Sequence, residues 1–187
     1  MKKHKAVFLD RDGVLNKSYK FRPPNSPEEL ILLPGVPEAI RRLNAAGYLV
    51  FVVTNQGGVG LGYMTQETLD AIHEKLVQEV AKGGGTFTEI AACTHKPKEG
   101  CACRKPKPGL ILDLAEKYSV DLEQSFMVGD RDVDIQAGKA AGTRTILIKS
   151  REQTTEEADY TCKSLLEASE VILSLDSTGP LEDGVEG

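Results

Sequence analysis

Two carboxylates directly follow a short apolar run near the beginning of the chain. The run at positions 6–9 has the residue types of a buried strand, and Asp10, Asp12 and Gly13 come at its end. Side chains two positions apart on an extended strand lie on the same face, about 6–7 Å apart. One carboxylate of such a pair can attack an electrophile while the other moves a proton, and a divalent cation would reduce their repulsion. Alone, the motif is as typical of a strand followed by an acidic turn.

Two further apolar runs also end in polar residues. Thr54 follows the run 48–53, and the next four residues, 55–58, offer backbone N–H groups. A hydroxyl and backbone N–H groups are donors that can bind a phosphoryl oxygen, although the segment also reads as a simple turn. Asp130 follows the run 125–128. It is a candidate ligand for magnesium, which prefers oxygen ligands.

Other charged residues lie next to these positions. Asp132 fits a helix N-cap, and Asp134 lies close enough to help hold a neighbouring cation. Arg104 and Lys105 precede a predicted helix. A guanidinium binds phosphate as a planar fork and an ammonium binds it as a point charge, so both suit a phosphorylated ligand.

The elements that must position these residues alternate along the chain. This alternation predicts an α/β fold with a Rossmann-like, doubly wound, mostly parallel sheet that is covered by helices on both faces. Because open sheets of this kind bind ligands beyond the carboxyl ends of their strands, the polar residues above should meet there. The predicted strands are the opening run and 48–53, 87–92, 125–128, 145–148 and 158–162, and the predicted helices are 36–46, 65–82, 109–118, 132–141 and 163–173.

Bulk composition limits the possible function classes. The 187 residues are 40% hydrophobic, which predicts a single domain over residues 1–174, followed by a flexible tail over 175–187. The net charge of −5 gives no global positive field to attract nucleic acid. The first apolar run is too short for a signal peptide or a membrane span, so we expect a cytoplasmic protein with no membrane partner.

Three cysteines and a histidine lie within eleven residues. In a cytoplasmic chain they are more typical of metal ligands than of disulfides. Four such ligands satisfy a tetrahedral structural zinc site, although Cys-x-Cys is tighter than the usual Cys-x-x-Cys. Free thiols in a mobile loop are the alternative, but a long loop without a core favours a metal staple over residues 93–105. The four predicted zinc ligands are Cys93, His95, Cys101 and Cys103.

In this order, the motifs resemble the haloacid dehalogenase superfamily of phosphotransferases, and the match covers nearly the whole chain. The resemblance implies that Asp10 attacks phosphorus and forms an aspartyl-phosphate, while Asp12 protonates the leaving oxygen and later activates water. It implies that magnesium is held by Asp10, Asp130 and the backbone carbonyl of Asp12. Thr54 and Lys105 would steady the phosphoryl group during transfer. This division of labour suits phosphoryl transfer, which needs positioning and charge neutralisation.

The Cys-x-His and Cys-x-Cys-Arg-Lys-Pro pattern resembles a branch of this superfamily without a cap domain. That branch contains heptose-bisphosphate phosphatases and histidinol-phosphate phosphatases. The segments 10–16 and 54–56 resemble the former, whereas Arg131 after the acidic ligand is typical of the latter. Neither interval between the motifs has room for a cap, so surface loops must select the substrate. The substrate-binding residues that we expect are Arg11, Asn55, Gln56, Gly57, Arg104 and Arg131.

A small phosphorylated sugar, in particular a heptose 1,7-bisphosphate, is the favoured substrate. Arg104 and nearby lysines offer charge for a second phosphate. Histidinol phosphate would require carboxylates near the entrance, and Glu99 is the only acid in the zinc loop. A DNA 3′-phosphatase would need stacking aromatics, but aromatic residues make up 5% of the chain and Trp is absent.

The remaining expectations concern partners and unassigned residues. We expect a monomer whose partner is a small phosphorylated molecule. A zinc-stabilised binding protein without turnover is the alternative, and it would lack one of the four residues Asp10, Asp12, Lys105 and Asp130, all of which are present. His73, in the predicted helix 65–82, is expected to face solvent without a partner.

Overall fold

The central strand of the sheet is β1 (Ala6–Leu9), which ends at the first carboxylate. The computed structural model describes residues 2–20, 22–150 and 152–176. Within these ranges one six-stranded sheet has the order β3-β2-β1-β4-β5-β6, and each adjacent pair is parallel. The predicted α/β class is confirmed. The other strands are β2 (Leu49–Asn55), β3 (Glu89–Cys93), β4 (Phe126–Gly129), β5 (Arg144–Ile148) and β6 (Tyr160–Cys162).

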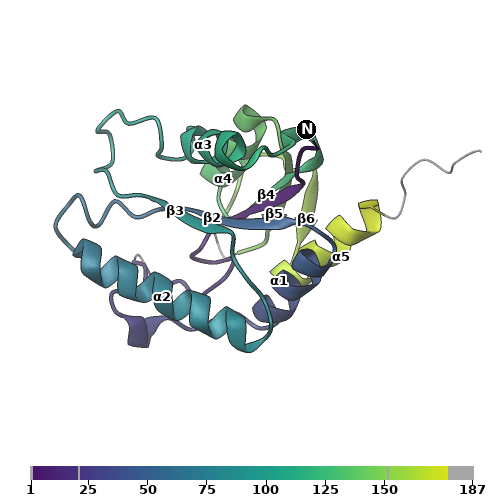
Figure 1. Ribbon diagram of the computed structural model, residues 1–187. Helices are drawn as coiled ribbons and strands as arrows, with labels where there is room; N and C mark the ends of the chain where they lie inside the picture. Colours follow the sequence, from purple (N-terminus) through teal and green to yellow (C-terminus); the bar gives the residue numbers. More distant parts are fainter. Residues whose placement is uncertain (1, 21, 151, 177–187) are drawn as a thin grey trace, which may run out of the picture.

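Helices cover both faces of this sheet (Figure 1). On β1, Val7 and Leu9 pack into the apolar cluster of one face, and Ala6 and Phe8 pack into the cluster of the other. A strand that is buried on both faces reads as a continuous apolar run, which is why the sequence signal was clear. One face carries α1 (Val36–Ala45), α2 (Gln66–Lys82) and α5 (Leu165–Asp176), and the other carries α3 (Gly109–Tyr118) and α4 (Asp132–Ala141).

Most observed helix ends lie within one or two residues of the predicted ends, because local capping residues determine them. The hydroxyl of Thr65 accepts from Thr68 N at 3.1 Å and caps α2. At α4 the predicted bounds, 132–141, are confirmed, but Asp132 is the first helical residue and the N-cap is Arg131. The carboxylate of Asp134 accepts from Arg131 N at 3.2 Å and satisfies that end of the helix.

The last helix continues further than the sequence predicted. α5 extends to Asp176, so the first two residues of the predicted tail are helical, and 177–187 lie outside the described residues. The carboxylate of Asp176 accepts from Lys5 Nζ at 2.9 Å and from Tyr48 Oη at 2.8 Å. These contacts hold the C-terminal end of α5 against the residues that precede β1 and β2.

The strand order reverses direction on either side of β1. Val7 pairs with Val50 of β2 on one side and with Phe126 of β4 on the other. This is the topological switch point at which doubly wound sheets open a crevice beyond the carboxyl ends of their strands. The described segments around β2 fold onto this sheet and form no separate cap. No helix in the described ranges has the length and apolar character to cross a membrane.

Candidate active site

The turn after β1 brings the two halves of the site together. The carbonyl of Arg11 accepts from Leu15 N at 2.8 Å, and Gly13 takes a φ of +88°, which disfavours other residues. The Asp130 carboxylate lies directly against Gly13, where a Cβ atom would come within 2.8 Å of Asp130 Cγ. Glycine therefore lets the end of β4 approach the end of β1.

Lys105 lies between two buried carboxylates. Its Nζ donates to Asp10 Oδ1 at 2.9 Å, to Asp134 Oδ1 at 2.6 Å and to the carbonyl of Val53 at 2.8 Å. Burial alone would lower the pKa of Lys105, but the charges of Asp10 and Asp134 outweigh it and raise that pKa above its usual value. The ammonium is therefore charged, as a group that steadies a phosphoryl oxygen must be.

Three carboxylates, those of Asp10, Asp130 and Asp134, form the acidic part of the site, with oxygen atoms within 4.8 Å of one another. Burial, and then the charge of Asp134, raise the pKa of Asp10 well above its usual value against the opposing effect of Lys105. The same two causes raise the pKa of Asp130 to about 6. Asp130 Oδ1 is buried without a hydrogen-bond partner. A buried, oxygen-rich, negatively charged cluster with an unpartnered acceptor fits a hard divalent cation.

The carboxylate of Asp12 is not part of this cluster. Arg11 grips it with Nε on Oδ1 at 2.9 Å and Nη2 on Oδ2 at 3.2 Å. Asn16 Nδ2 donates to Oδ1 at 2.9 Å, and Gln56 Nε2 donates to Oδ2 at 3.1 Å. Burial would raise the pKa of Asp12, but the Arg11 charge and these hydrogen bonds lower it overall. If Asp12 binds a cation, as the sequence predicted, its backbone carbonyl is the available group.

Two residues that were expected to bind substrate are buried behind Asp12. Arg11 is 0% exposed. Gln56 is 4% exposed, and its amide also donates to Thr54 Oγ1 at 2.9 Å, which links Thr54 to Asp12. Neither side chain offers surface to a ligand in this conformation. We therefore assign both to the support of Asp12 and Thr54 rather than to substrate contact.

His73 is the residue that sequence reasoning placed wrongly. It is only partly exposed, and its Nε2 lies 3.0 Å from Nη1 of Arg11. Burial, and then the Arg11 charge, lower the pKa of His73 to about 4. A signal existed in the sequence, since position 73 lies one helical turn from Leu69 and Leu76 on the buried stripe of α2.

Asn55 holds the backbone of Lys105. The amide of Asn55 donates to the carbonyl of Lys105 at 3.0 Å and accepts from Lys105 N at 3.0 Å. This reciprocal pair fastens the segment that leaves the cysteine-rich loop to the end of β2. Asn55 also lines the cavities described next, so contact with substrate stays a prediction for this residue.

Two adjoining cavities open at the strand ends. One, of about 840 Å³, is lined by Asp10, Asp12, Thr54 and Asp130 and is bordered by Tyr19. The other cavity, of about 580 Å³, is lined by residues that include Gly57, Arg104, Arg131 and Glu152. Asn55, Lys105, Arg131 and Glu152 border both. A ligand longer than one phosphate group can therefore extend from the first cavity into the second.

Arg104, which lines the second cavity, carries an unsatisfied donor. Nη1 of Arg104 is buried and has no hydrogen-bond partner. A Cβ at Gly57 would lie 3.0 Å from this nitrogen, so the glycine leaves the space that the guanidinium occupies. Arg131 is exposed, and its Nε lies 3.5 Å from Glu152 Oε2. Sequence reasoning missed Glu152 because it comes from the loop between β5 and β6, far from every motif.

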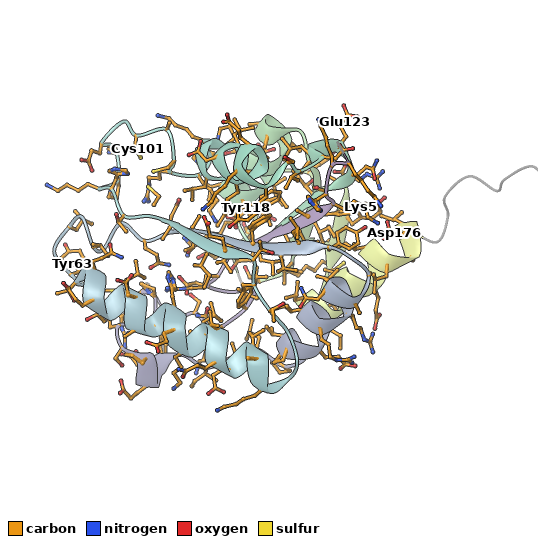
Figure 2. All side chains as sticks on the ribbon, in the orientation of Figure 1. Lys5, Tyr63, Cys101, Tyr118, Glu123 and Asp176 are labelled. Carbon is orange, nitrogen blue, oxygen red and sulfur yellow. The ribbon has the colours of Figure 1, made fainter. Side chains whose placement is uncertain are left out.

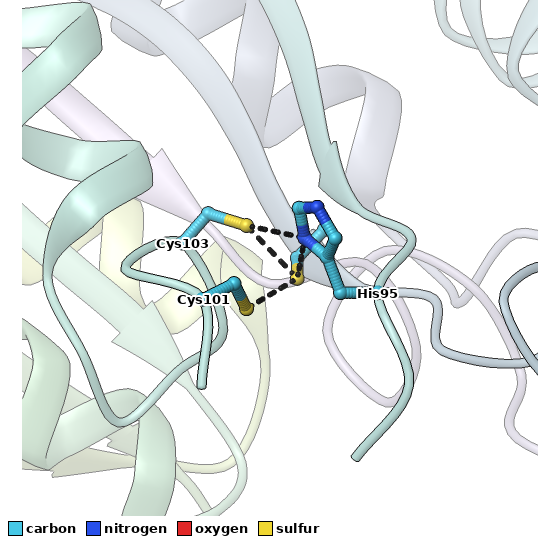
Figure 3. A group of neighbouring side chains, drawn as sticks. His95, Cys101 and Cys103 are labelled. Atoms are coloured by element: carbon cyan, nitrogen blue, oxygen red, sulfur yellow. Dashed lines mark hydrogen bonds between the residues drawn. The ribbon is translucent and has the colours of Figure 1, made fainter. Parts of the chain in front are cut away.

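The four predicted zinc ligands converge (Figure 3). His95 Nδ1 lies 3.5 Å from Cys93 Sγ and 3.1 Å from Cys103 Sγ. Cys93 Sγ lies 3.6 Å from Cys101 Sγ and 3.0 Å from Cys103 Sγ. A tetrahedral zinc site with bonds of about 2.0–2.3 Å has edges of about 3.3–3.8 Å. The separations of 3.5 and 3.6 Å lie in this range and those of 3.0 and 3.1 Å are slightly shorter, so the donor set is compatible with zinc. Figure 2 places Cys101 at the end of the molecule opposite Asp176.

The chain is similar to known proteins along most of its length. A family model described as HAD-hydrolase-like matches residues 102–168. The curated D-glycero-beta-D-manno-heptose-1,7-bisphosphate 7-phosphatase of Pseudomonas putida is 42% identical over 146 residues, covering 78% of this chain and 83% of that protein. The Helicobacter pylori protein of the same name is 35% identical over 176 residues, covering 92% and 99%.

Solved structures agree with the sequence relatives. The crystal structure of the D,D-heptose 1,7-bisphosphate phosphatase from B. bronchiseptica, complexed with magnesium and phosphate, has a TM-score of 0.84 at 38% identity and covers 91% of this chain and 99% of that one. The enzyme from Burkholderia thailandensis has a TM-score of 0.69 at 33% identity, with the same coverage. The chain therefore belongs to the HAD-like hydrolases, in the branch of the D-glycero-beta-D-manno-heptose-1,7-bisphosphate 7-phosphatases.

Proposed function

We propose that this protein is a magnesium-dependent phosphatase that removes the 7-phosphate from D-glycero-D-manno-heptose 1,7-bisphosphate. The observation that carries the proposal is the convergence of Asp10, Asp12 and Asp130 on one cavity, with Lys105 Nζ 2.9 Å from Asp10. We also propose that the protein is cytoplasmic and monomeric, as expected from the sequence. Sedimentation analysis of the purified chain tests the monomer.

In the first step a carboxylate oxygen of Asp10 attacks phosphorus, and the ester P–O bond breaks. The leaving alkoxide takes a proton from Asp12. The donors around Asp12 favour its carboxylate, so we infer that the charge of the bound phosphate raises the pKa of Asp12 and lets it arrive protonated. In the second step Asp12 takes a proton from water, the water oxygen attacks phosphorus, and the bond to Asp10 breaks. Thr54 donates to a phosphoryl oxygen throughout. Lys105, whose three N–H groups contact Asp10, Asp134 and the Val53 carbonyl, steadies the phosphoryl group by its positive charge.

Two metals complete the proposal. Asp10, Asp130 and the carbonyl of Asp12 would hold Mg²⁺, which supplies positive charge to the phosphoryl oxygens and to the crowded carboxylates. Asp134 supports this group through Lys105. Zinc on the four Cys and His ligands would hold the loop that leads to Arg104, and we assign it no part in the chemistry.

The second cavity suits the phosphate that is not cleaved. The buried Nη1 of Arg104 requires an acceptor, because an unpaired buried donor costs about 1–3 kcal/mol. If the guanidinium turns toward the second cavity, which Arg104 lines, a phosphate oxygen there would supply that acceptor, and Arg131 at the border would add charge. A bisphosphate can span both cavities, whereas a monophosphate leaves the Arg104 donor unpaired.

The test measures kcat/KM on heptose 1,7-bisphosphate and on a heptose 7-phosphate for the wild type and for Arg104→Ala. We expect a loss of roughly 10–100-fold on the bisphosphate, since a charge-assisted hydrogen bond contributes about 1.5–3 kcal/mol, and a much smaller loss on the monophosphate. Asp10→Asn is the inactive control. Equal losses on both substrates would show that Arg104 does not read the second phosphate.

Histidinol phosphate stays the second candidate, and one residue favours it. Glu152 borders both cavities and supplies the entrance carboxylate that the zinc loop lacks. Such a carboxylate could bind the amine of histidinol phosphate. If histidinol phosphate has the higher kcat/KM and Glu152→Gln removes that advantage, the heptose assignment is wrong. If Glu152→Gln leaves a bisphosphate preference unchanged, this alternative is excluded.

A further inference from the structure

A buried arginine connects the second carboxylate of the site to helix α2. Arg11 is the largest fully buried side chain among the described residues. A guanidinium stays charged at all relevant pH values, has donors only, and presents them in a rigid plane. Two of its nitrogens donate to Asp12 at 2.9 and 3.2 Å, and the third lies 3.0 Å from Nε2 of His73. The guanidinium is therefore held by Asp12 on one side and by His73 on the other.

The contact between Arg11 and His73 determines the tautomer of the imidazole. Because the guanidinium cannot accept a hydrogen bond, Nε2 of His73 must be the acceptor, and the single proton of the neutral ring must be on Nδ1. A protonated ring would place a second cation against Arg11 with no acceptor between them. The lowered pKa of His73, about 4, agrees with a ring that is neutral at pH 7.

This acceptor fixes the rotation of the guanidinium. Removing it would leave a buried N–H without a partner, and Arg11 could regain it only by turning away from Asp12. Asp12 would then keep its bonds to Asn16 and Gln56 but lose the bidentate contact that aligns both of its oxygens. A general acid acts efficiently only when its oxygen is held within reach of the leaving group.

We propose that His73 is a positioning residue for the phosphatase reaction: it orients Arg11, and Arg11 orients Asp12. The inference rests on the proposed function, because it assigns Asp12 the role of general acid. It differs from a packing role, since it requires an acceptor atom at the position of Nε2 and not only a ring of the right volume.

Three substitutions separate an acceptor from a space-filler. His73→Gln keeps a carbonyl oxygen near the position of Nε2. His73→Asn has the same amide, one methylene shorter, and cannot reach Arg11, while His73→Phe keeps the ring without an acceptor. Should the Phe variant fail to fold, the Gln and Asn pair still provides the comparison, because these two differ only in reach.

The readout is the ratio of kcat/KM on the sugar phosphate to kcat/KM on p-nitrophenyl phosphate. The sugar alkoxide needs a proton to leave, whereas p-nitrophenolate does not, and kcat/KM reports only the steps up to its departure. We expect His73→Asn and His73→Phe to lower this ratio at least about tenfold, a part of the 10²–10⁴-fold that a positioned acid supplies. His73→Gln should restore most of it.

A double variant tests whether His73 acts through Asp12. In an Asp12→Asn background the ratio is already low, and adding His73→Asn should change it little, because both substitutions remove the same function. A ratio that stays at the wild-type value in His73→Asn and His73→Phe overturns the inference, as does an undiminished effect in the double variant. If Asp12→Asn itself leaves the ratio unchanged, the assignment of Asp12 as general acid fails instead.

Discussion

Replacing Gly13 by alanine should disable the site by moving one ligand. The added Cβ would lie 2.8 Å from Asp130 Cγ, whereas carbon atoms rest at about 3.5–4.0 Å, so the carboxylate must retreat by roughly 0.7 Å or more. A displacement near 1 Å in a catalytic group can cost up to about 10²-fold in rate. We expect kcat/KM to fall about 10–100-fold, equivalent to about 1.4–2.7 kcal/mol of transition-state stabilisation.

Gly47 provides a matched control for this substitution. Both glycines have a φ of +88°, and nothing lies within 4 Å of a Cβ built at Gly47. Each alanine variant should pay the same backbone strain of about 1–2 kcal/mol, and so lose a few degrees of melting temperature at about 2–4 °C per kcal/mol. Only Gly13→Ala should also lose activity and need more magnesium for half-maximal rate.

The assay is phosphate release as a function of magnesium concentration, with melting curves for both variants. Wild-type activity and magnesium dependence in Gly13→Ala would refute the reasoning, because Asp130 would then tolerate the displacement. A similar loss of activity in Gly47→Ala would attribute the effect to general destabilisation rather than to the contact with Asp130.

Two more predictions concern the chemistry and the loop. Asp10→Asn should abolish turnover because an amide cannot form the acyl-phosphate, while Asp12→Asn should lower kcat/KM on a sugar phosphate far more than on an aryl phosphate; equal losses would argue against Asp12 as the general acid. Cys101→Ser, or removal of zinc, should leave the sheet folded. It should weaken recognition of the bisphosphate through Arg104 more than catalysis through Lys105, because Asn55 holds the Lys105 backbone without help from the zinc loop. Full activity in Cys101→Ser, or purified protein that contains no zinc by elemental analysis, would contradict the structural role of zinc.

The fold was predictable because its signals are local. Buried parallel strands read as continuous apolar runs, and the residues that end them, such as Asp10, Thr54 and Asp130, can be seen in the sequence. Helix α3 was predicted to the residue, because the apolar period and the turn-forming residues around it agree. The bounds of α4 were also predicted to the residue, but its N-cap was not, because Asp132 is a residue type common at N-caps whereas Arg131 occupies that position.

The support of the site was not predictable because it depends on contacts between distant segments. Arg11 is next to the candidate carboxylate Asp12 in the sequence, which suggested contact with a ligand. The direction of the Arg11 side chain depends instead on His73, which α2 brings to it. His73 looked solvated because its partner is 62 positions away. Gln56 was expected at the substrate, but it is 4% exposed and its amide donates to Asp12 and Thr54. The amide of Asn55 binds the Lys105 backbone, and its contact with substrate stays a prediction. A polar side chain next to a catalytic residue can therefore face the ligand or support the site, and spacing alone cannot distinguish these roles.

The pairing of β1 with β4 also sets the order in which the site can come into being. Ala6 N donates to Ser125 Oγ across 119 positions, and Asp10 and Asp130 meet at the other end of the same two strands. A chain emerging from the ribosome thus exposes Asp10 and Asp12 long before it has synthesised Asp130 or Lys105. On the proposed function, the nascent chain carries its nucleophile during that interval without Asp130, the other carboxylate of the proposed cation site. On the proposed function, activity therefore requires that β4 has docked against β1, and we expect a truncated product that lacks β4 to be unable to hydrolyse phosphate esters.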